Sequence, residues 1–308
     1  MKLLHLLALG IFAGSFSCSL SNNTHVKQEV MVIGHRGDAG NFPENSIPGF
    51  LSAVEKGAGA LEMDVVISAD KKVVVSHEPY MASHYMLDPQ GNPIPKKKQL
   101  EYNFYEMDYE TIKRFEAGLK KNKDFPKQKK ISSYKPLLEE VIDSVEAFTS
   151  KTGKEPVEYW VEVKSGPKNY HKFQPGPAEF ARLVMNVIQD KGVEERTVIK
   201  SFDPNFLNQL HKDHPQVRIS YLVSKGGIDR NLSLLDFKPD YYSPRHKLIK
   251  SVKFVDSVKT GNMKLVPWTV NRKRKIRKML KKGVDGIITD YPERALEILR
   301  QETATAKK

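Results

Sequence analysis

The chain has 308 residues, of which 39% are hydrophobic and 28% are charged, and its formal net charge is +13. These proportions are ordinary for a globular protein, and the length allows one large domain or two small ones. Cys18 is the only cysteine, which excludes an intramolecular disulfide.

Residues 1–17, MKLLHLLALGIFAGSFS, are typical of a secretory signal peptide. Their apolar segment, residues 3–12, is too short to cross a bilayer as a helix. Cys18 stands where a bacterial lipoprotein is cleaved and lipidated, although Ser15 replaces the usual leucine. We therefore expect an exported protein, anchored at the periplasmic side of a membrane or at the cell surface through lipidated Cys18, with residues 18–29 as a polar tether. A secreted protein without lipid is the alternative.

From residue 31 onward, short β-branched runs alternate with amphipathic segments. The predicted strands cover residues 31–34, 60–67, 73–76, 157–163, 197–200, 217–223, 240–242, 265–268 and 286–289. The predicted helices include residues 46–56, 137–149, 177–191, 205–212, 273–282 and 292–301. This alternation indicates parallel β/α units, and about eight of them predict an α/β fold of the TIM (β/α)₈ barrel type. The barrel would span residues 30–300, followed by a polar tail at residues 301–308.

Residues 79–134 break this alternation and hold six of the twelve tyrosines. We interpret them as a small insertion after the second strand region, lying over one end of the barrel, because loops of this length are usually functional or separately folded. A solvated decoration is the alternative. The aromatic residues favour packing or ligand contact; they include Tyr102, Phe104, Tyr105 and Tyr109.

Two segments are densely basic, residues 120–130 and 272–282. The second carries Ile276, Met279 and Leu280 at helical spacing, which indicates a solvated helix with a narrow buried stripe. A basic surface can bind nucleic acid, but no nucleic-acid-binding motif accompanies either segment. We therefore expect no nucleic-acid partner.

The segment VIGHRGDAGNFPENS, residues 32–46, places a histidine and an arginine on a glycine-flanked bend directly behind the first strand. A plain connection from strand to helix needs only turn residues and a cap, and Pro43 and Ser46 suit the start of the next helix. His35 and Arg36 therefore suggest a site, although a turn with an incidental histidine fits this segment equally well.

Two acidic residues share one face of the second strand, ALEMDVVIS. Because side chains alternate along a strand, Glu62 and Asp64 point to the same side. Buried together they would repel each other and lose hydration, and a divalent cation offsets that cost. Carboxylate oxygens suit the hard ions Ca²⁺ and Mg²⁺, so we predict one such ion. A solvent-facing strand face is the alternative.

Further polar side chains follow other strands. In VEYWVEVKSG, Glu162 and Lys164 share a face near a strand end, where barrel enzymes carry catalytic residues, although a simple ion pair is the alternative. His77 ends the run KVVVSH. Two imidazoles, three carboxylates, an arginine and a lysine at strand ends suit hydrolysis of a phosphoester, in which cations hold the anion and imidazoles move protons.

In this order and spacing, the motifs resemble those of the glycerophosphodiester phosphodiesterase family. The resemblance rests on GHRG, PENS, LEMDV and VVVSHE, and on the later segments KPLLEEVI, VEVKS, SFDPNFL, VPWTVN and GVDGIITDYPE. It implies a TIM barrel with a small insertion, and a metal-dependent enzyme. Its substrate would be a small glycerophosphodiester, and its products an alcohol and sn-glycerol 3-phosphate.

The resemblance also implies roles for individual residues. These are acid/base catalysis by His35 and His77, metal binding by Glu62, Asp64 and Glu162, phosphate contacts from Arg36 and Lys164, and support from Glu44, Asn45 and Asn271. Trp268 would form one wall of the pocket, with a buried core indole as the alternative. Glu78 replaces the usual aspartate after the second histidine, with the same chemical character. The insertion lacks the usual pattern after that histidine, so substrate selectivity stays open.

Two other functions fit such a barrel. Phospholipases acting on intact lipid also combine two histidines with metal carboxylates, but they need exposed apolar loops that the sequence does not clearly show. An inactive surface binding protein should have lost a histidine or a carboxylate, and all are present. The sequence leaves open the head group, the choice of Ca²⁺ or Mg²⁺ and the oligomeric state. It also leaves open whether the nucleophile is water or the neighbouring glycerol hydroxyl. Any contact with a membrane would be through the lipid anchor.

Overall fold

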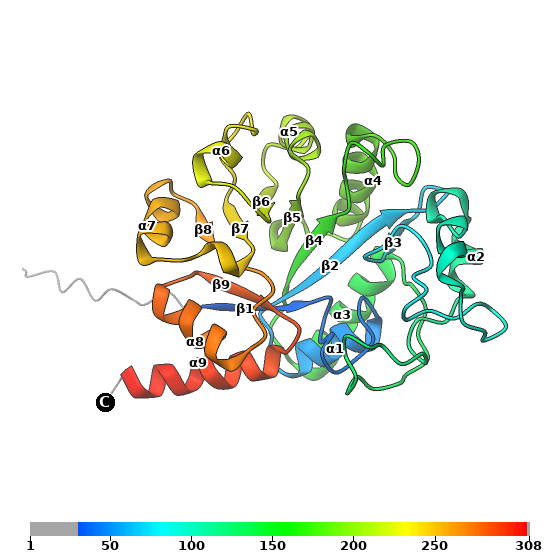
Figure 1. Ribbon diagram of the computed structural model, residues 1–308, viewed down its shortest axis with the longest axis horizontal. Helices are drawn as coiled ribbons and strands as arrows, with labels where there is room; N and C mark the ends of the chain where they lie inside the picture. The colour runs from blue at the N-terminus through cyan, green and yellow to red at the C-terminus, as the bar shows by residue number, and fades with distance from the viewer. Residues whose placement is uncertain (1–29, 307–308) are drawn as a thin grey trace, which may run out of the picture.

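Parallel strands and helices alternate along most of the chain in the computed structural model, which describes residues 30–306 (Figure 1). The parallel strands lie side by side in the order β8-β7-β6-β5-β4-β2-β1-β9. Their bounds are β1 Met31–His35, β2 Ala60–Ile67, β4 Glu158–Val163, β5 Thr197–Ser201, β6 Arg218–Val223, β7 Tyr241–Pro244, β8 Lys264–Leu265 and β9 Gly286–Thr289.

The two edges of this sheet meet without forming a regular ladder. The N–H of Asp285 donates to the carbonyl of Leu265 at 2.9 Å, and the N–H of Ile288 donates to the carbonyl of Pro267 at 3.0 Å. Pro267 has no N–H with which to pair, and β8 ends at Leu265, earlier than the strand predicted at residues 265–268. The result is a nearly closed barrel of eight parallel strands, which confirms the predicted TIM-barrel class.

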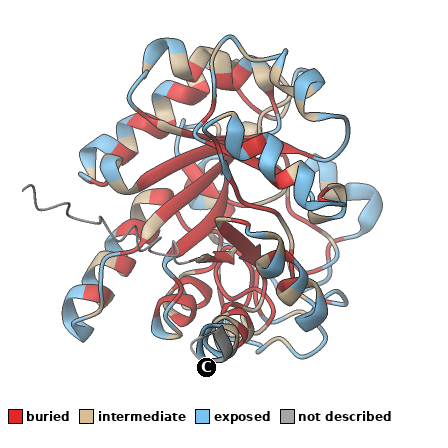
Figure 2. Ribbon diagram, turned by 90° about the vertical axis from the view of Figure 1, so that its left-hand side faces the viewer, coloured by how far each residue is buried: buried red, intermediate tan, exposed pale blue. Residues whose placement is uncertain are grey.

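Helices surround the strands, which are buried throughout most of their length (Figure 2). The longer helices are α1 Ile47–Glu55, α3 Leu138–Thr152, α4 Pro177–Asp190, α5 Pro204–Asp213, α7 Val252–Thr260, α8 Lys273–Lys282 and α9 Pro292–Ala306. Their apolar faces pack on outward-facing strand residues, such as Leu61, Met63 and Val65 of β2, in the largest buried cluster. On α8 the buried residues are Ile276 and Met279, which confirms the narrow stripe predicted there.

Besides α2 Tyr109–Lys113 of the insertion, two α-helices of the barrel were not predicted from the sequence. Helix α6, Ile228–Leu232, has only five residues and buries none of them. Helix α7 buries only Val255 and Val258. With so few buried positions neither segment shows a clear helical period, which is the signal that sequence analysis depends on.

The inward-facing side chains change character along the strands. A buried apolar cluster inside the barrel includes Ile33, Ala60, Trp160, Val198 and Ile288. Because side chains alternate, the next inward-facing residues along these strands are charged. Glu62 and Asp64 follow Ala60 on β2, Glu162 follows Trp160 on β4, and Lys200 follows Val198 on β5. The barrel interior is therefore apolar where these strands begin and charged toward their carboxyl ends, the end at which barrel enzymes carry their sites.

The segment predicted as an insertion lies beside the barrel, next to β3 Val73–Val75 (Figure 1). Strand β3 pairs antiparallel with the end of β2 and is not a barrel strand. The insertion contains α2 Tyr109–Lys113 and the 3₁₀ helices η1 Lys96–Glu101 and η2 Phe104–Glu106. It has its own buried apolar cluster, which includes Phe104, Tyr109, Ile112 and Phe115. The prediction that aromatic residues of the insertion pack together is therefore confirmed.

The last helix is longer than predicted. Helix α9 continues through Ala306, into the segment predicted as a polar tail at residues 301–308. Arg277 of α8 donates to the side chain of Gln301 at 3.0 Å and lies 3.3 Å from a carboxylate oxygen of Glu302. These contacts attach the added turns of α9 to α8.

The predicted signal peptide at residues 1–17, Cys18 and the tether at residues 18–29 lie outside the described residues. Within residues 30–306, none of the helices combines the length and the apolar character that crossing a membrane requires.

Candidate active site

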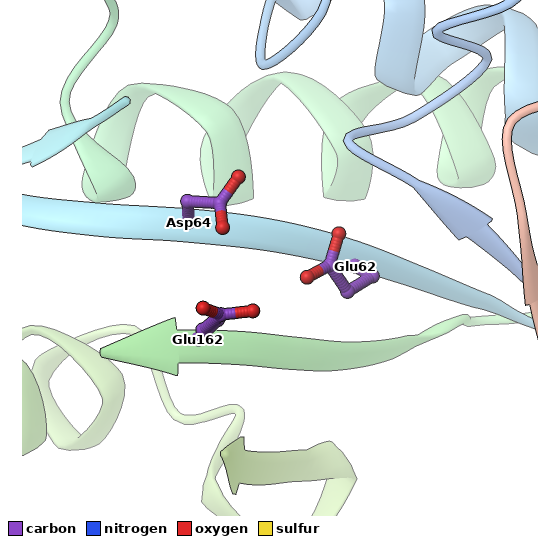
Figure 3. A group of neighbouring side chains, drawn as sticks. All are labelled: Glu62, Asp64 and Glu162. Carbon is purple, nitrogen blue, oxygen red and sulfur yellow. The ribbon is translucent and has the colours of Figure 1, made fainter. Parts of the chain in front are cut away.

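Three buried carboxylates meet at one point inside the barrel (Figure 3). Glu62 and Asp64 lie on the inward face of β2, and the register between β2 and β4 places Asp64 opposite Glu162. The exposed fractions of Glu62, Asp64 and Glu162 are 0%, 1% and 6%. One oxygen from each lies within 4.8 Å of the others. The structure therefore brings together the three residues that the sequence suggested as metal ligands.

Lys200 offsets part of this negative charge, although sequence analysis did not single it out. Its Nζ lies 3.0 Å from Oε1 of Glu62 and 3.9 Å from Oε2 of Glu162, and the side chain is 1% exposed. The strand register places Lys200 opposite Glu162. A lysine directly after the apolar pair Val198 and Ile199, in a predicted strand, was the available signal, because a buried charge must have a partner.

Lys164 and Arg36 offset further negative charge in the cluster. Nζ of Lys164 lies 2.6 Å from Oε1 of Glu162 and 3.6 Å from Oδ1 of Asp64, and Nε of Arg36 lies 3.1 Å from Oδ2 of Asp64. Burial alone would lower the pKa of Lys164, but the carboxylates of Glu162 and Asp64 raise it to about 12. Both residues are therefore cations at the edge of the carboxylate cluster.

The donor set fits a hard divalent cation. Oδ1 of Asp64 is buried and accepts no hydrogen bond within the described structure, although it is a strong acceptor. Burial alone would raise the pKa of Asp64, but Arg36 and Lys164 hold it well below its usual range. The carboxylate is therefore ionised and has one oxygen that accepts no hydrogen bond. Ionised carboxylate oxygens are the ligands that Ca²⁺ and Mg²⁺ prefer.

The bend after β1 brings His35 and Arg36 to this cluster. Arg36 has a φ of +51° and Gly37 a φ of +83°, both in the left-handed region. A Cβ atom on Gly37 would lie 2.6 Å from the backbone carbon of Gly49 in α1, so this position requires glycine. In this conformation the N–H of Arg36 donates to Oε2 of Glu62 at 2.9 Å.

Glu44 and Asn45 support the cluster from the loop before α1. Oε1 of Glu44 accepts a hydrogen bond from Nη1 of Arg36 at 2.8 Å. Nδ2 of Asn45 donates to Oδ2 of Asp64 at 2.9 Å, and its Oδ1 accepts from the Asp64 N–H at 3.2 Å. Ser46 follows as the N-cap of α1, as predicted.

Asp290, which sequence analysis did not single out, holds His35. Nδ1 of His35 lies 2.5 Å from Oδ1 of Asp290, and Asn271 donates to the other carboxylate oxygen, also at 2.5 Å. Burial alone would lower the pKa of His35, but Glu62 and Asp290 outweigh it and raise the pKa above 6.5. His35 is therefore suited to donate a proton near neutral pH. An acidic residue directly behind the buried strand β9 was the available signal.

His77 reaches the site from the segment after β3. Its Nδ1 lies 2.9 Å from Oε1 of Glu78. Burial alone would raise the pKa of Glu78, but the hydrogen bond and charge of His77 lower it to about 2. Glu78 is therefore an ionised acceptor, so a neutral His77 carries its proton on Nδ1 and leaves Nε2 free to accept one.

One pocket contacts both histidines. Its lining residues are His35, Arg36, His77, Glu162, Lys164, Lys200, Phe202, Trp268 and Thr269. The Trp268 ring is half-buried and packs edge-on against Phe202, with ring centroids 5.3 Å apart. Trp268 therefore forms a wall of the pocket and is not a buried core indole. Phe202, 39% exposed, was not singled out from the sequence.

A parallel barrel that gathers carboxylates, cations and imidazoles at the carboxyl ends of its strands has the architecture of a TIM-barrel enzyme. The sequence model of the glycerophosphoryl diester phosphodiesterase family matches residues 35–294. The chain belongs to this family of phosphoric diester hydrolases.

Two individual relatives agree with this assignment, and a more distant solved structure shares the fold. The glycerophosphodiester phosphodiesterase of Caldanaerobacter subterraneus subsp. tengcongensis is 30% identical over 278 residues, covering 89% of this chain and 99% of that protein. A Silicibacter pomeroyi crystal structure, assigned as a glycerophosphoryl diester phosphodiesterase, is 28% identical with a TM-score of 0.79, covering 89% of this chain and 94% of that one. An Oleispira antarctica phosphodiesterase in complex with the product sn-glycerol-3-phosphate is 20% identical with a TM-score of 0.69, covering 88% and 96%.

Proposed function

We propose that the protein hydrolyses small glycerophosphodiesters to an alcohol and sn-glycerol 3-phosphate. In this proposal His35 and His77 move protons, and one divalent cation, Ca²⁺ or Mg²⁺, binds Glu62, Asp64 and Glu162. The observation that carries it is the pocket in which both histidines meet, next to the three buried carboxylates. The product bound to the Oleispira antarctica phosphodiesterase supports a small-molecule substrate of this class.

Positive charge around the pocket binds the phosphate group. Arg36 and Lys164 both line the pocket, and their N–H groups are suitable donors to phosphate oxygens. The divalent cation, when bound, supplies further stabilisation of negative charge on those oxygens. The packed rings of Trp268 and Phe202 would lie against the apolar part of the substrate.

The two histidines are held by different carboxylates, Asp290 for His35 and Glu78 for His77, and we assign them opposite roles. An oxygen nucleophile attacks phosphorus while the bond from phosphorus to the leaving alcohol oxygen breaks. His77, held at Nδ1 by Glu78, accepts the proton of the nucleophile at Nε2. His35, held at Nδ1 by Asp290, donates its Nε2 proton to the leaving oxygen. Asp290 stabilises the imidazolium before the transfer.

Release of sn-glycerol 3-phosphate from glycerophosphocholine by the purified protein tests the proposal. We expect release that stops on chelation and returns when Ca²⁺ or Mg²⁺ is added. Full activity in a metal-free sample would contradict the metal assignment, and no release with either cation would contradict the function.

A substrate analogue without the free glycerol hydroxyl next to the phosphate identifies the nucleophile. If that hydroxyl attacks, a cyclic phosphate forms first and the analogue is inert. If water attacks, the analogue is hydrolysed. The same assay separates the other functions: faster head-group release from intact phospholipid indicates a phospholipase, and binding of the diester without turnover indicates a binding protein.

We further propose that the protein is exported and anchored through lipidated Cys18, at the periplasmic side of a membrane or at the cell surface. The short apolar segment at residues 3–12 and the solitary cysteine support this. Mass spectrometry of the mature N-terminus should find Cys18 first and acylated. A different start, or a free thiol at Cys18, would contradict the anchor and leave the enzymatic proposal unaffected.

A further inference from the structure

A buried lysine directly after the insertion has no part in the proposed chemistry. The side chain of Lys135 is 0% exposed, and no carboxylate oxygen of the described residues lies within 4.0 Å of its Nζ. Burial lowers its pKa below the ordinary value, although the more distant charges of Glu44 and Glu78 act in the opposite direction. A buried ammonium group without an adjacent carboxylate is unfavourable for stability, so its presence calls for another explanation.

The hydrogen-bond partner of Lys135 is a buried tyrosine of the insertion. Nζ donates to Oη of Tyr85 at 2.9 Å, and Tyr85 is 3% exposed. The Tyr85 hydroxyl in turn donates to Oε2 of Glu78 at 3.0 Å. Burial and the nearby Glu78 raise the pKa of Tyr85 well above 10, so the phenol keeps the single proton that it donates.

Glu78 extends this connection to the catalytic histidine. One of its carboxylate oxygens accepts from Tyr85, and the other lies 2.9 Å from Nδ1 of His77. Three hydrogen bonds therefore join Lys135 to His77 through Tyr85 and Glu78. Neither Lys135 nor Tyr85 lines the pocket that His77 contacts, so neither is placed to touch substrate.

We propose that Lys135 and Tyr85 are positioning residues for His77, acting through Glu78. The ammonium group polarises the phenol and strengthens its hydrogen bond to Glu78, and this bond keeps the carboxylate from rotating away from the imidazole. Glu78 then fixes the ring orientation and the Nδ1–H tautomer, which directs Nε2 to the reacting phosphate. The insertion thus helps to build the catalytic site. This inference rests on the proposed role of His77 in phosphodiester hydrolysis.

A purely structural role for Lys135 predicts a different response to its replacement. Lys135→Met keeps the length of the side chain and removes the buried charge, so a positioning role predicts an unchanged or higher Tm. It also predicts a kcat about 10-fold lower with KM unchanged, as for other residues that orient a catalytic group. A structural role predicts a lower Tm, and no loss of kcat in the fraction that stays folded.

The test combines kinetics on glycerophosphocholine with the tautomer of His77. The variants are Lys135→Met, Tyr85→Phe and their combination, each alone and together with His77→Ala. If the pair acts through His77, each variant lowers kcat in the wild-type background and has no further effect beside His77→Ala. In ¹⁵N-histidine spectra, the signal assigned to His77 should shift from the Nδ1–H tautomer toward a mixture in the same variants.

Lys113→Met is the matched control. Like Lys135, Lys113 lies beside a tyrosine, 4.9 Å from the ring centroid of Tyr134, but it donates to the carboxylate of Glu140 at 3.1 Å. Within residues 30–306, no side-chain hydrogen bond connects this group to His77. Its kcat and the His77 tautomer should be unchanged. Equal losses in both backgrounds, an unchanged kcat in Lys135→Met, or an unchanged tautomer would overturn the positioning role. The wild type could fail to hydrolyse glycerophosphocholine while the His77 tautomer still changes in Lys135→Met. That result would contradict the proposed function and support the positioning role.

Discussion

Nδ1 of His35 lies 2.5 Å from Oδ1 of Asp290, although the two residues are 255 positions apart in the chain. Strand β1 pairs with β9, so the end of the first barrel strand lies beside the end of the last. Closure of the barrel therefore places a carboxylate against the imidazole. The charge state of a proposed catalytic group thus depends on the completed fold.

This contact predicts a change in pH dependence. A proton donor is active below its pKa, so turnover should fall as the pH rises through the raised pKa of His35. Asp290→Asn removes one of the charges that raise this pKa, so the alkaline limb of the pH–rate curve should move to lower pH. Asp290 is outside the proposed metal ligands, so the shift should persist with cation bound. Asp143→Asn, at an exposed ion pair with Lys191, is the control.

An alkaline limb that stays in place in Asp290→Asn would contradict the assignment of His35 as the proton donor. The same contact has a consequence for stability, because a raised pKa favours the folded state when the histidine is protonated. That contribution is complete below pH 6.5 and is lost as the pH rises through the pKa of folded His35.

Lys200→Met should destabilise the metal-free protein by about 3–5 kcal/mol, because Glu62 keeps a buried charge and loses the cation beside it. Urea unfolding measures this loss. Added Ca²⁺ or Mg²⁺ should restore part of it, since a bound cation offsets the same carboxylates and stabilises the folded state. Lys191→Met breaks an exposed ion pair and should cost less than about 1 kcal/mol. A loss unaffected by divalent cations would contradict the metal site.

Gly37→Ala should lower both stability and turnover. The added Cβ would lie 2.6 Å from the backbone of Gly49, in a residue with a φ of +83°. We expect a loss of more than about 2 kcal/mol, together with displacement of His35 and Arg36. Gly153→Ala, at the C-cap of α3, is the control: its φ is +63°, but no atom lies within 4 Å of an added Cβ. If both variants lost the same free energy of unfolding, the cost would come from the positive φ alone. The bend after β1 would then have room for a Cβ atom, which would contradict this prediction.

Strand alternation made the carboxylate cluster predictable. Because Glu62 and Asp64 are two residues apart on one strand, local geometry is enough to place them on one face. The helix start at Ser46 and the buried stripe of α8 depend on equally local patterns. Alternation of strands and helices then fixed the class of fold, since few architectures accept it.

Other parts of the site depend on contacts between distant segments. Asp290 meets His35 only when the barrel closes, and Lys200 meets Glu62 across β4. Lys135 comes from a loop, where neither helical nor strand periodicity predicts burial. The short extent of β8 depends on how Pro267 lies at the closing edge of the sheet. Sequence patterns report local geometry, so they do not reveal these partners.

Turnover and cation affinity of His35→Ala and His77→Ala, measured side by side, test the central claim most directly. Each variant should lose a factor of about 10²–10⁴ in kcat on glycerophosphocholine. Calorimetric titration should give wild-type affinity for the divalent cation, because neither imidazole belongs to the carboxylate cluster. Asp64→Asn, by contrast, should lose both turnover and cation binding. Near-normal turnover in either histidine variant would contradict the account.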